Sequence, residues 1–549
     1  MCHGASGGRH PAEPVKADVQ GQVALVLHAH LPYVRHPEHP RFYEEAWLFE
    51  AITECYLPLA WKMEAWSADR LPWRLSLTVS PTLAEMLGDS VLAARYREHL
   101  ESLLDLGRKE LDRTALDPAL RPLAEQAVAR LRCCYSRRDP GRWLLDQFRG
   151  HQEAGNLEIL GCAATHALLP LLVSEPASIR AQLAAGDATY RRWFGRSPRG
   201  FWLPECGWVP ELESFLIEAG LEWVVLETHG ITQGTPTPHE SIFRPIRTPG
   251  GVLAVGRDPA SARQVWSRSS GYPGDPRYRE FHRDLGHDAD WAYVGPHLPT
   301  GRRTFTGFKY HRITGTDVPA HAKQVYDRAA ALEAVASHAE HFVSERLRIG
   351  REAGAILGRT PLMVAPYDAE LFGHWWHEGP EFLDEVVRRM AAPGSALEAV
   401  LPGRFSRSEP TLSLPAASSW GEGGHFGVWL DESNAAMQTP LRRAGATMQA
   451  LADQFSGRPL SVVQDRALRQ AGRELLLAQA SDWPFLVKMQ TAGAYPELRF
   501  QSHLEQFQFL TGALQSDAVE QSGFLIRLEA QEARSPLFPD LDWHWWQSH

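Results

Sequence analysis

Seven short apolar runs in the first two-thirds of the chain constrain its fold more than any other feature. Each is four to five residues long and lies near a polar residue, a proline or a glycine. Continuous apolar runs of this length are typical of buried parallel strands, because a half-exposed strand alternates apolar and polar residues instead. The predicted strands are Val23–Leu27, Leu75–Val79, Leu157–Gly161, Phe201–Pro204, Trp223–Leu226, Val252–Val255 and Leu362–Ala365.

Helical patterns separate many of these strands, and such alternation is typical of α/β proteins with a parallel sheet. Amphipathic helices are predicted over Ser90–Leu106 and Pro122–Arg132, and another over Glu211–Ala219, which follows a proline at the expected helix start. Seven strands suit a barrel slightly smaller than the eight-stranded form. The predicted fold class is therefore α/β, a (β/α)7 barrel with helical insertions and a C-terminal α-helical domain.

The gaps between the predicted strands indicate the domain organisation. We expect the barrel to span residues 22–392. Two gaps, about 83–155 and about 259–360, are too long for simple crossovers, so we interpret both as insertions. From 393 to 549 the chain is largely helical. The clearest helices of the second insertion and of this C-terminal part are Ala320–Glu352, Ala435–Phe455 and Val463–Ala480.

Composition excludes several classes of protein. The net charge of −10 and the sequence pI near 6.2 argue against a nucleic-acid binder, which normally carries a basic face. No apolar stretch reaches the 18 or more residues of a membrane helix. Residues 1–21 lack the apolar core of a secretory signal and are predicted to be a disordered polar leader. The six cysteines show no zinc-finger spacing and fit a reducing compartment, so we expect a cytoplasmic protein.

Polar side chains stand where the predicted strands stop. Catalytic residues of a parallel α/β barrel gather at the carboxyl ends of its strands. A single carboxylate at such a position is more often a helix cap or a solvated loop residue, but here the pattern recurs at several strand ends. His28 and His30, two residues apart on one strand, face the same side. The strand-end residues are His28, His30, His166, Glu205, Arg257, Asp258, Asp368 and Glu370.

The chain has nineteen tryptophans and only thirteen tyrosines. Several tryptophans lie in polar or glycine-rich stretches rather than on helical apolar stripes. An indole ring in such a loop suits the apolar face of a sugar ring, although core packing is about equally frequent for any one of them. The candidate stacking residues are Trp47, Trp266, Trp420 and Trp429.

Glu205 and Asp368 end two different strands of the same predicted barrel. Two carboxyl groups on either side of a glycosidic bond suffice for sugar transfer, and a retaining pair lies about 5–5.5 Å apart. A metallohydrolase is the alternative, because His28, His30 and His166 with Asp258 or Asp368 could ligate Zn²⁺, as the His/His/Asp sites of polysaccharide deacetylases do. The residues by themselves leave both hypotheses open.

Five motifs bring in a family resemblance. The chain resembles glycoside hydrolase family 57, and within it the 1,4-α-glucan branching enzymes, from about Val23 to about Leu510. Four further stretches, LPYVRHPE, VWSRSSGYPGDPRYREFHRD, GFKYHRITG and AQASDWPF, resemble the same branch. The five motifs are HAH (His28–His30), GCAATHA (Gly161–Ala167), WLPECGW (Trp202–Trp208), APYDAELFGHWW (Ala365–Trp376) and SSWGEGGHFGVW (Ser418–Trp429).

The resemblance implies a (β/α)7 barrel and a retaining mechanism that uses no metal or other cofactor. It implies that Glu205 is the nucleophile and Asp368 the general acid/base. It also implies an α-glucan substrate such as amylose or glycogen, a C-terminal domain that contributes to the glucan site, and a monomer or weak homo-oligomer. The implied substrate-binding residues are His28, His30, His166, Trp47, Arg257, Asp258, Trp266, Trp420 and Trp429.

One departure from the family pattern leaves the acceptor open. Related enzymes often carry a tyrosine in the loop before a PxxTPxG stretch, which is thought to close over the acceptor. Here TPTPHESIFRPIRTPGG has no tyrosine, and Glu240 stands at the matching position. A missing lid would let water compete for the covalent intermediate. A 4-α-glucanotransferase and an α-amylase are therefore alternatives, as are a metal-dependent polysaccharide deacetylase and a non-catalytic glucan-binding protein.

Overall fold

The computed structural model describes residues 18–267, 270–298, 301–315, 317–407, 410–521 and 523–548. The predicted leader falls mostly on residues 1–17, which lie outside the described residues. Its last residue, Gly21, is the first residue of strand β1 and pairs with Leu397.

Seven parallel strands form the centre of the molecule in the order β7-β5-β4-β3-β2-β1-β8. A parallel bridge between Arg257 and Val364 joins the end of β7 to β8 and closes the sheet into a barrel. All seven predicted strands are present, so the prediction of a (β/α)7 barrel is confirmed. The strands are β1 (Gly21–Ala29), β2 (Leu75–Val79), β3 (Leu157–Cys162), β4 (Gly200–Trp202), β5 (Trp223–Leu226), β7 (Leu253–Gly256) and β8 (Leu362–Asp368).

Side chains alternate between the inside and the outside of this barrel. Ala24 and Val26 of β1 and Leu362 and Val364 of β8 belong to one buried cluster in its interior. Continuing the alternation along each strand brings His28 and Asp368 to the same inner face at the carboxyl end. The register agrees, because these two residues are direct partners across β1 and β8.

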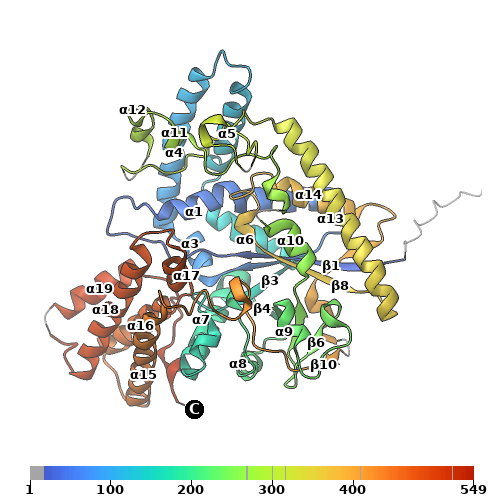
Figure 1. Cartoon of the computed structure of the whole chain (residues 1–549). Helices are drawn as coiled ribbons and strands as arrows, with labels where there is room; N and C mark the ends of the chain where they lie inside the picture. The colour runs from blue at the N-terminus through green and yellow to red at the C-terminus, as the bar shows by residue number, and fades with distance from the viewer. Residues whose placement is uncertain are drawn as a thin grey trace, which may run out of the picture.

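Helices cover the outside of the barrel (Figure 1). Helices α1 and α2 are joined without a break by a π-helical turn, η1 (Ile52–Tyr56). The covering helices are α1 (Glu45–Ala51), α2 (Leu57–Ala68), α3 (Pro81–Leu87), α7 (Pro176–Phe194), α8 (Leu212–Glu218), α9 (Thr228–Thr232), α10 (Pro259–Trp266) and α14 (Gly379–Ala391).

Two insertions project from the barrel on the side of α4, α5, α11 and α12 (Figure 1). The first consists of α4 (Ser90–Arg113) and α5 (Arg121–Tyr135), and the chain then returns through α6 (Pro140–Glu153), which packs on the barrel against β3 and α7. The second contains the short helices α11 (Leu285–Asp288) and α12 (Trp291–Val294) and ends in the long helix α13 (Arg328–Leu357). This last helix starts later than the predicted Ala320, because the Asp327 side chain caps it by accepting from the backbone N–H groups of Ala329 and Ala330.

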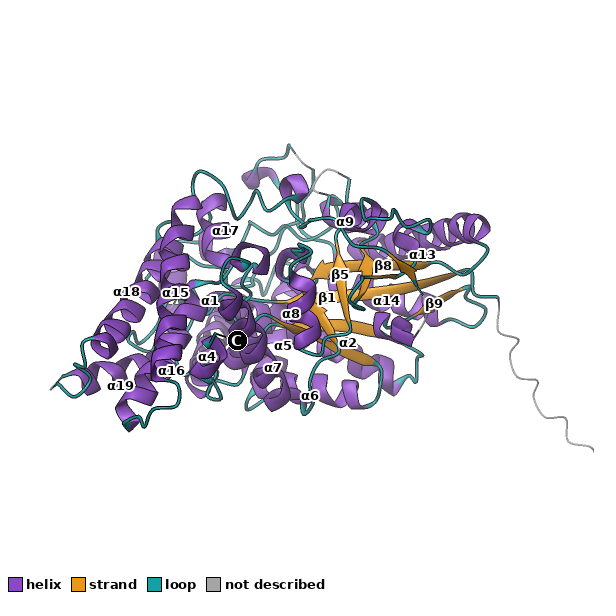
Figure 2. Ribbon diagram, turned by 90° about the horizontal axis from the view of Figure 1, so that it is seen from below, coloured by secondary structure: helices purple, strands orange, loops and turns teal. Residues whose placement is uncertain are grey.

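The C-terminal helices lie together at one side of the barrel, as Figure 2 shows. Before them, two short strands after residue 393 still pair with the barrel sheet: β9 (Leu397–Ala399) with β1, and β10 (Thr411–Leu412) with β6 (Ile246–Arg247). Within the described residues, no helix is both long and apolar enough to span a membrane. The C-terminal helices are α15 (Gln438–Phe455), α16 (Val462–Ala478), α17 (Asp482–Met489), α18 (Tyr495–Gln515) and α19 (Phe524–Arg534).

Candidate active site

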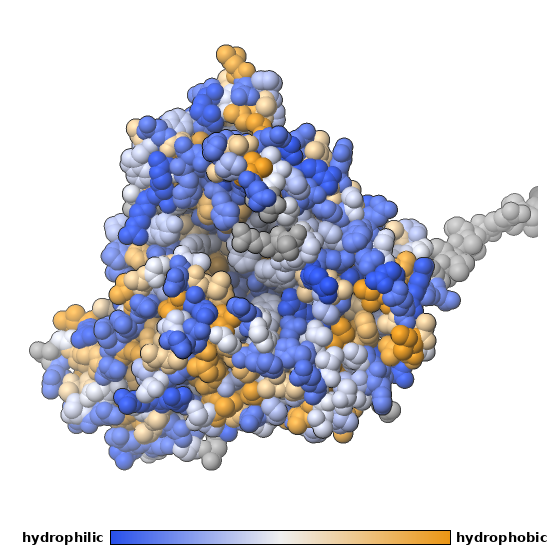
Figure 3. Space-filling view, viewed as in Figure 1, coloured by the Kyte–Doolittle hydropathy of each residue, from blue (hydrophilic) through white to orange (hydrophobic). Residues whose placement is uncertain are grey.

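A cavity of about 430 Å³ opens at the carboxyl ends of the strands, between the barrel and the C-terminal helices. The face of the molecule in Figure 3 is hollowed between the insertions and these helices. The cavity is lined by His28, His30, Leu31, His166, Glu205, Arg257, Trp266, Asp368, Glu370, Trp375, Trp420, Gly421, Val428, Trp429, Asp482 and Phe485.

Glu205 follows β4 in a tight turn, Pro204–Cys206. Its backbone φ is +61° and that of Cys206 is +51°, a left-handed conformation that non-glycine residues rarely adopt. Such strain persists only where the surrounding structure imposes it, and it is concentrated at functional sites. The carboxylate accepts one hydrogen bond from Trp420 Nε1 at 2.6 Å and another from Ser481 Oγ at 3.1 Å.

Asp368 is the last residue of β8 and lines the same cavity. In the described part of the chain, no hydrogen bond reaches its carboxyl group. Burial raises the pKa of this carboxyl well above its ordinary value, and the nearby carboxylates of Glu370 and Glu205 add to the shift. This environment therefore favours the protonated form of Asp368.

The two carboxyls differ in the groups that oppose the effect of burial on their pKa values. Burial raises the pKa of Glu205 to about 7, while the Trp420 hydrogen bond and the His30 ring oppose this rise. A carboxylate that accepts hydrogen bonds is stabilised in its charged form, whereas at Asp368 burial and the charges of Glu370 and Glu205 outweigh the opposing charge of Arg257. These surroundings favour the charged form of Glu205 over that of Asp368, and such a difference is typical of a pair of acids with distinct roles.

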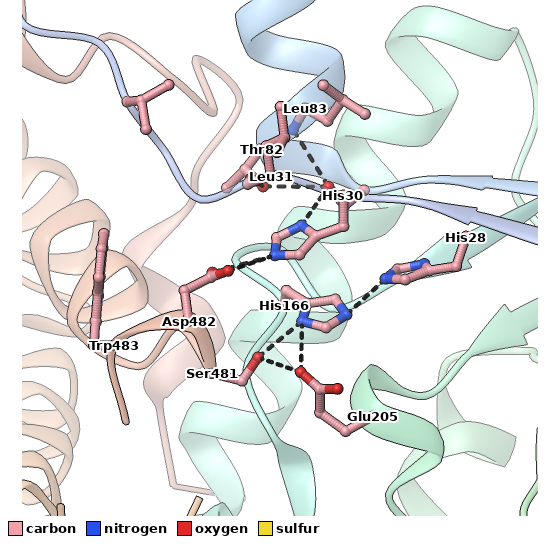
Figure 4. Close-up of polar contacts among 12 residues, drawn as sticks. His28, His30, Leu31, Thr82, Leu83, His166, Glu205, Ser481, Asp482 and Trp483 are labelled. Atoms are coloured by element: carbon pink, nitrogen blue, oxygen red, sulfur yellow. Dashed lines mark hydrogen bonds and ion pairs between the residues drawn. The ribbon is translucent and has the colours of Figure 1, made fainter. Parts of the chain in front are cut away.

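Three histidine rings stack beside Glu205, as Figure 4 shows. His28 Nε2 lies 2.9 Å from His166 Nε2, and the ring centroids of His30 and His166 are 3.9 Å apart. His166 Nδ1 lies 3.6 Å from Glu205 Oε1. Burial lowers the pKa of His28 and of His166 well below the ordinary value, so both rings are neutral. The three histidines, which the sequence predicts to stand at strand ends, therefore do lie side by side.

The C-terminal region supplies two residues that the sequence analysis missed, Ser481 and Asp482. Ser481 Oγ lies 2.8 Å from His166 Nδ1 and donates to Glu205, and Asp482 Oδ1 lies 3.0 Å from His30 Nε2. Figure 4 shows both side chains reaching from the C-terminal segment towards the barrel. The only sequence signal was the AQASDWPF stretch, which carries both residues but has no strand-end position.

The aromatic wall of the cavity agrees with three of the four tryptophans selected from the sequence. Trp266, Trp420 and Trp429 line it, and Trp202 packs beneath Trp420 with a centroid separation of 5.1 Å. Trp375 and Phe485 also line the cavity and are 43% and 38% exposed. Neither is among the stacking residues predicted from the sequence.

The other two selected residues, Trp47 and Asp258, do not line the cavity. Trp47 lies on α1 and packs edge-on against Tyr495 at 5.7 Å. Asp258 caps α10 by accepting from the backbone N–H groups of Ala260 and Ser261, and it pairs with the buried Arg346. The alternation of side chains explains its placement, because Asp258 follows the inward-facing Arg257 and therefore points outwards.

Arg257 lines the cavity floor. Its Nη1 donates to Glu227 Oε2 at 2.8 Å, and its guanidinium lies 5.7 Å from the centre of the Trp420 ring. Glu240, which stands where relatives often carry the lid tyrosine, does not line the cavity. Its carboxylate accepts from Thr411 Oγ1 at 2.6 Å and lies 3.6 Å from Arg359.

A metal site was the rival hypothesis for the three histidines. In the described ranges, no group of three or more His, Cys, Asp or Glu side chains is arranged to hold a metal ion. His28 and His166 direct their Nε2 atoms at each other, and His30 Nε2 contacts Asp482. The histidines contact one another and the residues around Glu205 instead of converging on one point.

A parallel barrel whose strand ends present two carboxyls of raised pKa to an indole-lined cavity is typical of a carbohydrate-acting barrel enzyme. Comparison with known families agrees. The model for glycosyl hydrolase family 57 matches residues 24–287, and the model for the C-terminal part of 1,4-alpha-glucan branching enzymes matches residues 440–546.

Full-length relatives extend the match to almost the whole chain. A 1,4-alpha-glucan branching enzyme of Thermococcus kodakarensis is 33% identical over 95% of this chain and 78% of its own length. Its crystal structure, a complex with glucose, superimposes with a TM-score of 0.85, at 31% identity over 96% of this chain and 97% of that one. The alpha-amylase AmyC of Thermotoga maritima superimposes with a TM-score of 0.88, at 36% identity over 96% and 99%. The chain belongs to glycosyl hydrolase family 57.

Proposed function

We propose that this protein is a retaining 1,4-α-glucan branching enzyme. The observation that carries the proposal is the segment 440–546, which matches the C-terminal part of branching enzymes and contains Ser481 and Asp482, the residues that enter the barrel site. The substrate is an α-glucan such as amylose or glycogen, bound along the indole rings of the cavity.

In the first half of the reaction, Glu205 attacks the anomeric carbon while Asp368 protonates the departing glycosidic oxygen. The raised pKa of Asp368 supports its role as the acid, and the hydrogen bonds to Glu205 support its ionised form. The reaction gives a glycosyl-enzyme with inverted configuration and a free 4-hydroxyl on the leaving chain. His28, His30 and His166 orient the sugar hydroxyls beside Glu205.

In the second half, Asp368 removes the proton from an incoming 6-hydroxyl, which attacks the anomeric carbon and releases Glu205. Two inversions retain the α configuration and create an α-1,6 branch. This step requires that a sugar hydroxyl reach the intermediate before water does. Trp266, Trp375 and Phe485, at the mouth of the cavity, are the candidates that hold the acceptor and exclude water.

Hydrolysis of the same intermediate is the second candidate function. Two observations favour it: the similarity to an alpha-amylase over the whole chain, and the placement of Glu240 outside the cavity. A 4-α-glucanotransferase would use the same carboxyl pair with a 4-hydroxyl as the acceptor. The three activities differ only in the acceptor.

One assay separates them. Purified protein is incubated with amylose, half of the product is debranched, and chain lengths and reducing ends are measured in both halves. A branching enzyme releases short chains only after debranching, with few new reducing ends before it. New reducing ends in proportion to chain shortening would instead identify a hydrolase. Redistributed chain lengths that debranching leaves unchanged would identify a 4-α-glucanotransferase.

A further inference from the structure

A second cavity, of about 50 Å³, lies between the π-helical turn η1, helices α4 and α5, and the loops of the second insertion. It shares no lining residue with the catalytic cavity. Its polar lining includes three cationic side chains, those of Arg130, Arg279 and Lys309. The full polar lining consists of Glu50, Thr53, Glu54, His99, Gln126, Arg130, Arg279, Thr306, Lys309, Tyr326 and His377.

Cations dominate the surroundings of His377, which lines this cavity and is 6% exposed. Burial lowers the pKa of His377 well below its ordinary value, and the charges of Arg279, Arg130, Arg328 and Lys309 lower it further. The ring is therefore neutral. Three of these four cations, all except Arg328, line the cavity themselves.

Glu54 offsets part of this positive charge. Its carboxylate accepts from His374 Nδ1 at 2.7 Å. Burial opposes its ionisation, but the hydrogen bond and charge of His374 and the charges of Lys309 and Arg279 outweigh burial and lower the pKa of Glu54 to about 2.

The other neighbouring carboxyls are mostly engaged elsewhere. Glu378 accepts from Tyr326 Oη at 2.6 Å, and Glu381 accepts from Arg328 at 3.0 Å. Asp284 accepts from the Thr306 hydroxyl at 2.7 Å and from three backbone N–H groups. Burial and the charge of Glu54 raise the pKa of Glu50 well above its ordinary value, which disfavours its charged form.

Two guanidinium groups are left without a close carboxylate partner. Within the described residues, the Arg130 side chain has one polar contact, His377 Nδ1 at 3.5 Å from its Nη1. The Arg279 side chain, 8% exposed, comes no closer to a carboxylate than 3.8 Å, at Glu54 Oε1, and makes no hydrogen bond to a described residue. Desolvating a charged group is costly unless a counter-charge accompanies it, so an anion in this cavity would stabilise both guanidinium groups beyond what Glu54 alone provides.

We propose that this cavity is a binding site for a small tetrahedral oxyanion of the phosphate or sulfate class. Arginine presents several N–H donors in a planar fork that matches two oxygens of such an anion, and Lys309 adds a cation to the same cavity. One water molecule requires roughly 10–15 Å³ of such space, so the cavity of about 50 Å³ has room for about four waters, which is the scale of one small tetrahedral oxyanion. It is too small for a phosphorylated sugar, and the ligand is therefore the free anion.

The position of the site suggests its effect. Glu54, which faces Arg279, belongs to η1 and also holds His374, the neighbour of the cavity residue Trp375. Gly373, with φ of +118°, packs so tightly on this turn that a Cβ would lie 1.9 Å from Glu54 O. A bound oxyanion would fix the insertion, helix α5 and this turn together beside the catalytic loop.

The test measures thermal unfolding of the full-length protein in sodium phosphate, sulfate or chloride at equal ionic strength and pH 7.5. We expect phosphate and sulfate to raise the midpoint saturably by about 2 °C or more over chloride, since a ligand of the folded state stabilises it by mass action. Glucose 1-phosphate should give no such rise. Equal unfolding midpoints in all three salts would overturn the proposal. A saturable rise with glucose 1-phosphate equal to that with phosphate would refute the inference that the ligand is the free anion.

Three variants locate the effect. Arg130→Gln and Arg279→Gln should each lose most of the rise with phosphate, and Arg130→Lys, which keeps the charge without the fork, should keep part of it. Arg142→Gln removes an exposed arginine that is paired with Asp146 outside this cavity, so it should respond as the wild type does. A full response in both Gln variants would place the anion elsewhere. Should a Gln variant fail to fold, isothermal titration of phosphate into Arg130→Lys, with a weakened affinity expected, decides in its place.

Discussion

The two sides of the catalytic cavity differ in what they contribute. The barrel side supplies the two carboxyls proposed to react, Glu205 and Asp368, on the ends of β4 and β8. The C-terminal side supplies groups that hydrogen-bond to the barrel side: Trp420 and Ser481 donate to Glu205, and Asp482 holds His30. Rigid strands fix where the carboxyls lie, while donors from outside the barrel decide how readily Glu205 ionises. The carboxyl groups and the donors that control the ionisation of Glu205 are therefore encoded in separate parts of the chain.

Removing the nucleophile on the barrel side should have the largest effect. Glu205→Gln keeps the shape of the side chain and its contact with Trp420 but cannot attack the anomeric carbon. We expect branching of amylose to fall at least about 10⁴-fold, as it does when other enzymes lose a nucleophile. Branch formation measured after debranching checks this, and near-normal activity would refute the assignment of Glu205.

The same variant has a stability signature with a definite sign. The pKa of Glu205 in the folded protein is about 7, above its ordinary value near 4.5, so ionisation of this group destabilises the fold as the pH rises through 7. Glu205→Gln should therefore match the wild type in thermal stability near pH 4.5 and exceed it at pH 8. A difference that does not change with pH would show that Glu205 is not a buried, titrating carboxyl.

Removing the acid on the barrel side should have the next largest effect. Asp368→Asn cannot protonate the leaving oxygen, and loss of general acid catalysis costs about 10²–10⁴-fold. A donor with a fluoride leaving group needs no such proton. In Asp368→Asn, the rate of glycosyl-enzyme formation from maltosyl fluoride should therefore fall much less than the rate from amylose. An equal loss for both donors would mean that Asp368 does not act as the acid.

The two sides of the catalytic cavity also differ in how well the sequence predicts them. The barrel side was predictable because its signal is local: an apolar run ends, and a polar residue such as Glu205 or His166 follows. Arg257 and Asp258 both follow β7, but side chains alternate along a strand, so only Arg257 points into the cavity. Asp258 points away from it and caps α10. Trp47 lies outside the lining of this cavity, and a polar sequence context does not reveal that α1 packs it against Tyr495.

Ser481 and Asp482 lay beyond sequence reasoning from the residues. They become part of the site only because the C-terminal helices pack against the barrel mouth, almost 300 residues after Glu205. A serine and an aspartate at the start of a helix are ordinary capping residues, so composition and periodicity give no signal. The second cavity is similar, because Arg130, Arg279 and Lys309 come together from two insertions whose relative placement only the structure gives.

Removing a hydrogen-bond donor to Glu205 on the C-terminal side should shift the pH dependence of kcat/KM rather than abolish activity. Trp420→Phe keeps an aromatic ring but removes the donor 2.6 Å from Glu205 Oε2. The pKa of Glu205 should rise above about 7, so the acid limb of kcat/KM should move to higher pH, with a loss of about 10-fold at neutral pH. Trp429→Phe is the matched control, because its buried Nε1 has no partner among the described residues and its removal should leave the limb in place.

Ser481→Ala should give the smallest shift of the series and thereby order the donors on the C-terminal side. The hydroxyl donates to Glu205 Oε1 over 3.1 Å, a longer hydrogen bond than that from Trp420, and it also contacts His166 Nδ1 at 2.8 Å. A neutral hydrogen-bond donor to a charged acceptor contributes about 1.5–3 kcal/mol, and the longer bond belongs at the lower end of this range. We expect the acid limb to move in the same direction as in Trp420→Phe but less far, and Ser481→Thr, which restores the hydroxyl, to move it back. A limb that stays fixed in Ser481→Ala while kcat falls would show that Ser481 orients His166 and has no influence on the ionisation of Glu205.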